Sequence, residues 1–278
     1  MKANLDFSPG LVPNEHQFKD PFFQRFTLRN APKPLRLSET VSKNYVFPTM
    51  YADVSCAIGI FKCSFDAALK LMPDPALKPV SMLGGKSLVI FSCYEYRTVM
   101  NVAPYNEIAM TIPVLAGGLR LPVLPMVLSG AFSNFGYYVF SMPVTSKENE
   151  LRGRNIWGLP KVTQDIDITV RDGYSTTVAR DERGEAYFEL NVPLNGGSQK
   201  SFDVTGRLYS KLDGRLLRAQ TNFKGDFNVV KRAEPGREYL KIGNGPAAAT
   251  LRSLELDKTP FQLRHTPGMN AAFDLPIM

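Results

Sequence analysis

The chain has 278 residues, 44% of them hydrophobic and 21% charged, which is typical of a globular protein with a sizeable core. No run reaches the roughly 18 consecutive apolar residues of a membrane-spanning helix, and the first residues lack the apolar segment of a signal peptide. These features exclude a membrane protein and predict a cytoplasmic one.

The net charge is +7, from 33 Lys and Arg against 26 Asp and Glu. The basic residues are scattered, and no helix-turn-helix, zinc-finger or RNP-like pattern accompanies them. We therefore expect no nucleic-acid partner. A positive field would instead favour an anionic small-molecule substrate.

Cysteine and histidine usage argues against a metal site. The three cysteines, Cys56, Cys63 and Cys93, lack the spacing of metal ligands and lie in apolar or alternating segments, so they are predicted to be buried free thiols. The two histidines, His16 and His265, are far apart in the sequence. We expect neither a metal nor a cofactor.

Residues 1–44 are rich in proline and polar residues and show no sustained period. They predict an irregular N-terminal arm that packs on the body of the protein or on a neighbouring subunit. Residues 45–278 contain no internal repeat or low-complexity segment and are predicted to form a single domain.

The first regular elements follow this arm. Val54–Lys62 is apolar and β-prone and predicts a strand, and Ser64–Met72 predicts a helix that Ser64 caps and that stops before Pro73. Ser87–Arg97 and Glu107–Leu115 predict two further strands.

Residues 116–135 are apolar and contain Gly and Pro, and no structure is assigned to them. They could form a lid or an oligomer contact. The aromatic and β-branched run Gly136–Val144 predicts a strand. Thr145 and Glu148 have the spacing of a capping box, which predicts a short helix running to about Arg152.

The next stretch, Gly153–Val162, places Lys161 directly after a proline and among Ile, Trp, Leu and Val residues. Burial among such side chains can lower a lysine pKa by up to about 3–5 units. A neutral amine can then attack a ketone and form a Schiff base. The alternative is an ordinary solvated loop lysine.

The rest of the chain has the pattern of strands and turns. Gln164–Arg171 alternates, Asp172-Gly173 predicts a hairpin turn, and Tyr174–Arg180 and Ala186–Val192 predict the next strands. Further β-like segments are Phe202–Tyr209, Arg215–Phe223 and Phe227–Lys231. Many short strands with few helices predict a β-rich barrel or sandwich.

The run Gly153–Val162 resembles the active-site segment of the acetoacetate decarboxylase family. That segment reads roughly Gly-Arg-Glu, three mostly apolar or small residues, an aromatic, then Pro-Lys, and its lysine is a Schiff-base nucleophile. The resemblance implies that Lys161 is catalytic. Two residues depart from it, since Asn155 replaces the glutamate and Val162 replaces a second lysine. Without that second cation, burial must account for most of any lowering of the Lys161 pKa.

A second match is Pro104-Tyr105-Asn106-Glu107, which resembles the Tyr-x-Glu element of the family. The resemblance implies that Glu107 is a catalytic carboxylate and that Tyr105 lies beside it in the substrate site. A carboxylate near an imine can shuttle protons during its formation and hydrolysis. A surface carboxylate at a turn is the alternative.

Three more residues are candidates for substrate binding. Arg97 could hold a substrate carboxylate, or could pair with Glu95 on the surface. Met142 and Trp157 could line the substrate pocket or pack in the core. The best-known decarboxylases have a second glutamate where Ser92 stands here, and their early arginine has no clear counterpart.

The resemblance covers about residues 45–276 and implies a β-rich α+β fold, with a barrel core, a surrounding antiparallel sheet and a few short helices. It also implies a homo-oligomer and a Schiff-base lyase that decarboxylates a β-keto acid through Lys161. Because Ser92 and Val162 replace charged residues, an aldolase or dehydratase acting on a 2-keto acid with the same lysine is an alternative. Asn155 and Val162 also leave open a non-catalytic protein that binds a small ligand.

Overall fold

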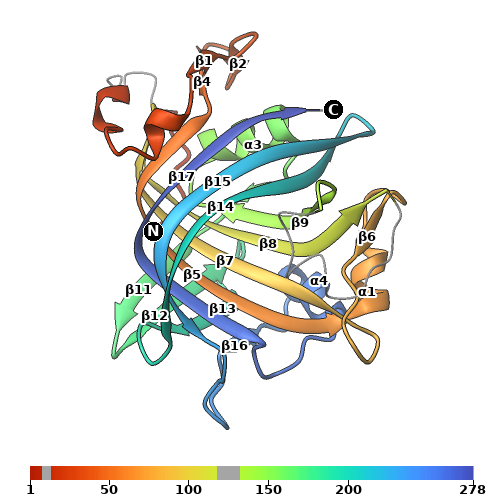
Figure 1. Cartoon of the computed structure of the whole chain (residues 1–278). Helices are drawn as coiled ribbons and strands as arrows, with labels where there is room; N and C mark the ends of the chain where they lie inside the picture. Colours follow the sequence, from red (N-terminus) through yellow and green to blue (C-terminus); the bar gives the residue numbers. More distant parts are fainter. Residues whose placement is uncertain (8–13, 118–131, 278) are drawn as a thin grey trace.

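The computed structural model describes residues 1–7, 14–117 and 132–277, and its main feature is a closed β-barrel (Figure 1). Around the barrel the strands pair in the order β9, β14, β15, β17, β5, β7 and β8, and β8 pairs with β9 to close the ring. The β9–β14 pair is parallel and the other pairs are antiparallel. The barrel strands are β5 (Thr49–Ser64), β7 (Lys86–Val99), β8 (Tyr105–Ala116), β9 (Phe135–Val144), β14 (Ser198–Leu212), β15 (Arg215–Val230) and β17 (Gln262–Ile277).

Smaller elements surround the barrel. β10 (Lys161–Thr163) pairs with β9, and β6 (Leu77–Pro79) pairs with β8. A second, antiparallel sheet contains β11 (Ile166–Arg171), β12 (Tyr174–Arg180), β13 (Ala186–Pro193) and β16 (Leu240–Ile242). Two-residue strands form the pairs β1 (Arg29–Asn30) with β4 (Val46–Phe47) and β2 (Leu35–Arg36) with β3 (Ser42–Lys43).

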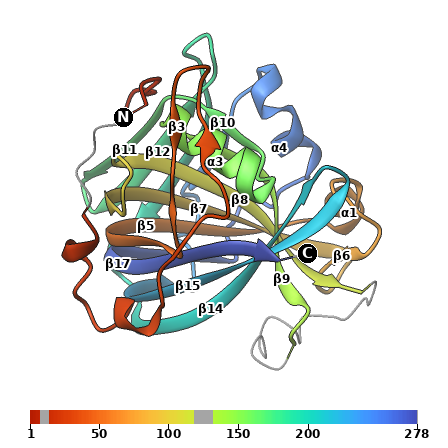
Figure 2. The same ribbon diagram turned by 90° about the horizontal axis from the view of Figure 1, so that it is seen from above.

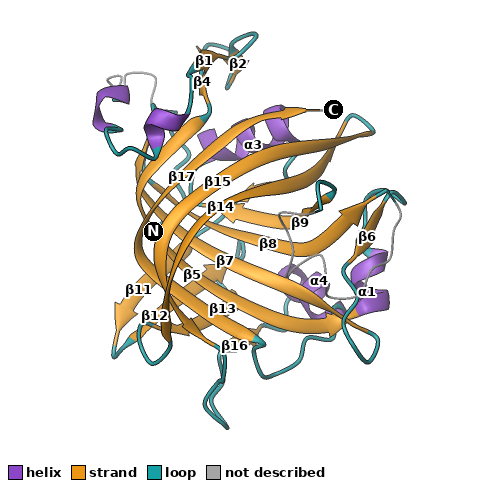
Figure 3. Cartoon of the chain, viewed as in Figure 1, coloured by secondary structure: helices purple, strands orange, loops and turns teal. Residues whose placement is uncertain are grey.

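Helices are few and short (Figure 3). In the described residues they are α1 (Phe65–Lys70), α3 (Lys147–Trp157), α4 (Ala249–Ser253) and the 3-10 helices η1 (Glu15–Gln17), η2 (Phe23–Arg25) and η4 (Pro246–Ala248). None of the helices in the described part of the chain is long and apolar enough to cross a membrane. The prediction of a β-rich fold with a barrel core and a few short helices is confirmed.

Alternation along the strands separates two faces of the barrel wall. On β5 and β7, Phe61 and Phe91 belong to the main hydrophobic core, which also contains Phe188 and Leu190 of the second sheet. The Phe91 and Phe188 rings are 5.1 Å apart. The residues that alternate with these on β5 and β7 face the interior of the barrel, where they line a cavity.

The described part of the N-terminal arm packs on the barrel. Phe22 and Phe23 are buried in a cluster with Met50 and Met100. The N-terminal ammonium of Met1 donates a hydrogen bond to the Ile166 carbonyl at 2.6 Å.

The helix predicted to start after Thr145 begins one residue later. Ser146 is its cap and accepts a hydrogen bond from the Asn149 amide, because the Thr145 hydroxyl instead accepts one from the Asn106 amide at 2.9 Å. The helix also continues past Arg152 to Trp157, so the first half of the Gly153–Val162 motif is helical. Gly158, with φ of 61°, ends it in the left-handed conformation that glycine adopts at little cost.

Other predicted elements fit more closely. Ser64 caps α1 as expected, accepting a hydrogen bond from the Ala67 amide. The segments Arg215–Phe223 and Phe227–Lys231, predicted as two strands, belong to the single long strand β15. In the segment 116–135, Ala116 ends β8 and Phe135 starts β9, while residues 118–131 lie outside the described residues.

Candidate active site

The barrel encloses a cavity of about 380 Å³. Inward-facing residues of three neighbouring strands form much of its wall. They are Cys56, Ile58 and Ile60 on β5, Ile90, Ser92, Tyr94 and Tyr96 on β7, and Glu107, Ala109 and Thr111 on β8. The wall is mainly apolar and aromatic, as small-molecule sites usually are.

Lys161 is the first residue of β10, the strand that follows α3, and its side chain lines this cavity. Helix α3 lies beside β10 (Figure 2). β10 continues in parallel along β9, with Lys161 opposite Met142. The turn between helix and strand is held by a hydrogen bond from the Leu159 amide to the Gly153 carbonyl at 3.0 Å. The position of the lysine therefore depends on the local structure of the motif.

Gly153 leaves the room that the Lys161 side chain occupies. A Cβ atom at position 153 would lie 2.3 Å from Lys161 Cδ and 2.7 Å from its Cε, far inside normal contact. The glycine of the motif is thus required by close packing against the lysine, not by its backbone angles.

Among the described residues, the ammonium group of Lys161 pairs with one carboxylate. Its Nζ donates to Glu107 Oε2 at 2.6 Å, and the two residues are only 6% and 5% exposed. Tyr96 donates its hydroxyl to the other oxygen, Oε1, at 3.3 Å. Lys161 Nζ also lies 5.7 Å from the centre of the Tyr105 ring. Two residues predicted to be catalytic, 54 positions apart in the chain, are therefore in direct contact.

Burial lowers the pKa of Lys161 from its ordinary value, since the charged amine is removed from water. Glu107 opposes this by favouring the charged amine, and the positive charge of Arg152 lowers the pKa further. The balance increases the fraction of neutral, nucleophilic amine at a given pH.

Arg152 is a part of this site that the sequence reasoning missed. Its side chain is 1% exposed, donates to Thr49 and Asn149, and lies 4.4 Å from the centre of the Tyr45 ring. Within the described part of the chain it forms no ion pair. Its positive charge lowers the pKa of Lys161 in a chain where Val162 stands in place of the motif's second lysine. Only its place directly before Gly153 could have drawn attention to it.

Only some of the predicted substrate-binding residues line the cavity. Met142 lines the cavity and is 2% exposed. Tyr105 is buried outside the cavity wall, with its ring near Lys161 Nζ. Trp157 is not in the cavity wall: its ring stacks on Phe273 with centres 4.7 Å apart, and its Nε1 donates to the Asp274 carbonyl at 2.7 Å. Of the two roles that the sequence left open for Trp157, packing is the one that these contacts describe.

Arg97 also lies outside the cavity wall. It pairs with Asp53 at 2.6 Å and with Glu95 at 3.0 Å and is part of the solvent-exposed surface. Its neighbour Tyr96 faces the cavity, so alternation along β7 turns Arg97 to the other side. The surface ion pair, the alternative left open by the sequence, is what the structure contains.

The cavity has two arginines that were not predicted as site residues, Arg264 on β17 and Arg207 on β14. All three cysteines are buried free thiols, as predicted. Burial raises the pKa of the Cys56 thiol, which lines the cavity, and so makes it a poor nucleophile. Within the described ranges, no group of three or more His, Cys, Asp and Glu side chains could hold a metal ion.

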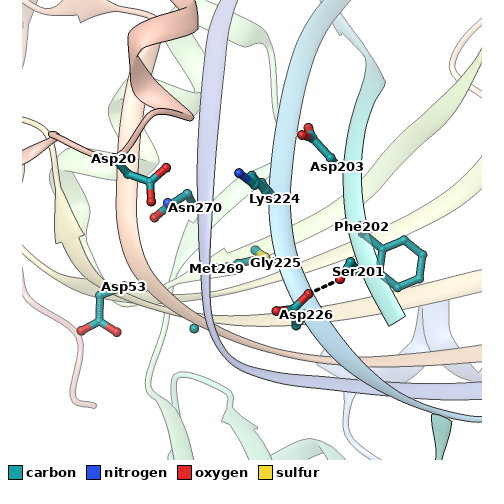
Figure 4. A pocket seen from close by; sticks show the side chains of 11 residues that line it. Asp20, Asp53, Ser201, Phe202, Asp203, Lys224, Gly225, Asp226, Met269 and Asn270 are labelled. Carbon is teal, nitrogen blue, oxygen red and sulfur yellow. Dashed lines mark hydrogen bonds between the residues drawn. The ribbon is translucent and has the colours of Figure 1, made fainter. Parts of the chain in front are cut away.

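A second hollow is lined by residues of β5, β14, β15 and β17 and by Asp20 (Figure 4). Charged side chains of Asp20, Asp53, Asp203, Lys224 and Asp226 line it. It shares Phe202 and Met269 with the barrel cavity but contains neither Lys161 nor Glu107. The barrel cavity is therefore the candidate active site.

A closed barrel with a buried lysine and carboxylate in its interior is the architecture implied by the motif. The family model for acetoacetate decarboxylase (ADC) matches residues 32–269, and the chain belongs to this family. A search of curated proteins found no match.

Solved structures share the fold at low sequence identity. One is a structure of acetoacetate decarboxylase, with 16% identity, a TM-score of 0.56 and coverage of 82% of this chain and 87% of the other. Another is acetoacetate decarboxylase from Legionella pneumophila, with 13% identity, a TM-score of 0.58 and coverage of 96% and 98%. A third is the enduracididine biosynthesis enzyme MppR complexed with pyruvate, with 11% identity, a TM-score of 0.56 and coverage of 82% and 88%.

Proposed function

We propose that the protein is a Schiff-base-forming lyase that cleaves a β-keto acid through an iminium on Lys161. The observation that carries this proposal is the buried contact of 2.6 Å between Lys161 Nζ and Glu107 Oε2 inside the barrel cavity. Membership of the acetoacetate decarboxylase family supports the same chemistry.

Glu107 can move the protons that imine formation requires. It first accepts a proton from the Lys161 ammonium, which leaves a neutral amine and a neutral carboxylic acid. The amine nitrogen then attacks the ketone carbon, and the carbonyl oxygen takes the proton from Glu107. Glu107 next removes one proton from the nitrogen and returns it to the hydroxyl, which leaves as water.

The resulting iminium accepts the electron pair of the bond to the carboxylate carbon. That bond breaks, carbon dioxide leaves and a neutral enamine remains. Protonation of the enamine carbon restores an iminium, and water releases the ketone and the lysine. Because the cavity is mainly apolar, it favours the step in which charge on the substrate is neutralised.

A second candidate is aldol or dehydratase chemistry on a 2-keto acid through the same iminium. Ser92 lies in the cavity wall, and Glu107 is the one carboxylate among the described residues that line the cavity. The fold is also shared with MppR in complex with pyruvate. A site with one carboxylate would hold a 2-keto acid without a second negative charge beside the reacting carbon.

The test compares carbon dioxide release from acetoacetate with aldehyde-dependent consumption of pyruvate. We expect turnover of one of these substrates, and its loss in Lys161→Ala. Lys78→Ala, a substitution of a partly buried lysine outside the cavity wall, is the matched control. Full turnover by the Lys161→Ala variant would contradict the mechanism. Ligand binding by the wild-type protein without turnover or imine formation would indicate the non-catalytic alternative.

A further inference from the structure

Arg264 is a cation in the cavity wall that the proposed chemistry does not use. It is half-buried near the start of β17, and its guanidinium lies 5.2 Å from the centre of the Phe202 ring. Its Nε donates to Gln262 Oε1. Among the described residues its two terminal nitrogens have no hydrogen-bond partner and no carboxylate pairs with it.

The strand order separates Arg264 from Lys161. Arg264 lies opposite Ile58, which lies opposite Ser92 and, one strand further, Ala109. Glu107, which holds Lys161 Nζ, lies on β8. Arg264 and β8 are thus three strands apart, roughly 14 Å around the curved wall at about 4.8 Å per strand. The residues between them in this row, Ile58, Ser92 and Ala109, carry no charge, and Arg264 and Lys161 line the same cavity.

The two cations also have different surroundings. The pKa of Lys161 responds to Glu107 and Arg152, whereas the pKa of Arg264, lowered by burial, responds to Tyr137 and Cys56. Tyr137 pairs with Pro113 on β8, six residues beyond Glu107. The Arg264 end of the cavity is therefore distinct from the Lys161 end.

Charges in the wall favour an anion at the Arg264 end. The described residues lining the cavity include three basic residues, Lys161, Arg207 and Arg264, and one acid, Glu107. Glu107 is already paired with Lys161. A half-buried guanidinium with free donors is a strong binding group for a carboxylate.

We propose that the cavity takes an oxo acid whose ketone lies at Lys161 and whose carboxylate, several carbon atoms away from that ketone, binds Arg264. This inference rests on the proposed function for the reaction at Lys161. It assigns a specificity role to Arg264. The carboxylate at Arg264 is held and is not the one that would leave, so a decarboxylated substrate would carry two acid groups.

The test uses ketones that differ only in the distant group. The probes are 6-oxoheptanoate and 2-heptanone, in which a methyl group replaces the carboxylate, and the short pair acetoacetate and 2-butanone. Each is titrated with sodium borohydride, and intact mass gives the concentration for half-maximal labelling of Lys161. The variants are Arg264→Gln and, as a matched control outside the cavity wall, Arg97→Gln.

In the wild-type protein, 6-oxoheptanoate should half-saturate labelling at a concentration at least tenfold lower than 2-heptanone. Arg264→Gln should remove this difference while labelling by 2-heptanone stays unchanged, which also shows that the variant is folded. Arg97→Gln should retain the difference. The short pair should show no preference that depends on Arg264.

Equal half-saturation by the two long ketones in the wild-type protein, or a preference that survives in Arg264→Gln, would overturn the inference. A binding measurement separates this failure from failure of the proposed function. Heptanoate, which cannot form an imine, should raise the Tm of the wild-type protein and not that of Arg264→Gln. Stabilisation by heptanoate without labelling of Lys161 by any ketone would support Arg264 as an anion site and contradict the Schiff-base chemistry alone.

Discussion

The packing of Gly153 against Lys161 leads to a sharp prediction for Gly153→Ala. The new methyl group would lie 2.3 Å from Lys161 Cδ, whereas ordinary contact begins at 3.4 Å, so the lysine chain must move by about 1.1 Å. Such a shift breaks the contact of 2.6 Å between Nζ and Glu107. Because a misplacement of about 1 Å can cost on the order of 10²-fold in rate, imine formation should slow by about that factor.

The same substitution should not unfold the protein. Replacing glycine by alanine inside a helix ordinarily stabilises it by about 0.5–1 kcal/mol, which offsets part of the strain. The assay is the rate of borohydride-trapped adduct formation at saturating ketone, with thermal unfolding measured in parallel.

Asn155→Ala is the matched control, since Asn155 is exposed on the same helix. It should keep the wild-type rate. A Gly153→Ala protein that forms the adduct within threefold of the wild-type rate would refute the packing argument.

Three further predictions concern the surrounding residues. Glu107→Gln should slow imine formation by about 10²–10⁴-fold. Because Glu107 raises the pKa of Lys161, the same variant should move the rising limb of the pH–rate profile to lower pH. Arg152→Met removes a cation that lowers that pKa, so its rising limb should move to higher pH; a limb that stays in place in both variants would contradict the electrostatic account. Ser146→Ala removes the cap of α3 and should destabilise the protein by about 1 kcal/mol, measured as the free energy of unfolding in urea.

Local patterns predicted much of the fold. The alternation of Gln164–Arg171 and the turn at Asp172-Gly173 correspond to β11, β12 and their hairpin. Helix α3 continues past the predicted end at Arg152 although Gly153 lowers helix propensity, and the close contact with the Lys161 side chain explains the glycine. Helix propensity is a property of single residues and does not predict the contact between Gly153 and Lys161, which are eight positions apart.

Site residues that belong to a short sequence motif could be predicted, whereas contacts between distant strands could not. Lys161 and Glu107 were both identified, but their contact depends on β9 lying between β8 and β10. Arg264 was missed because only closure of the barrel brings the start of β17 to the cavity. For Arg97 the sequence left two roles open, and strand parity, with Tyr96 facing inward, favours the surface ion pair.

The proposed function depends on an imine between Lys161 and a ketone substrate. The most direct measurement is intact mass after incubation with acetoacetate or pyruvate and sodium borohydride, followed by peptide mapping. One adduct per chain on Lys161, absent in Lys161→Ala, is the predicted result. No adduct on a folded protein with any small ketone, or an adduct on a different lysine, would contradict it.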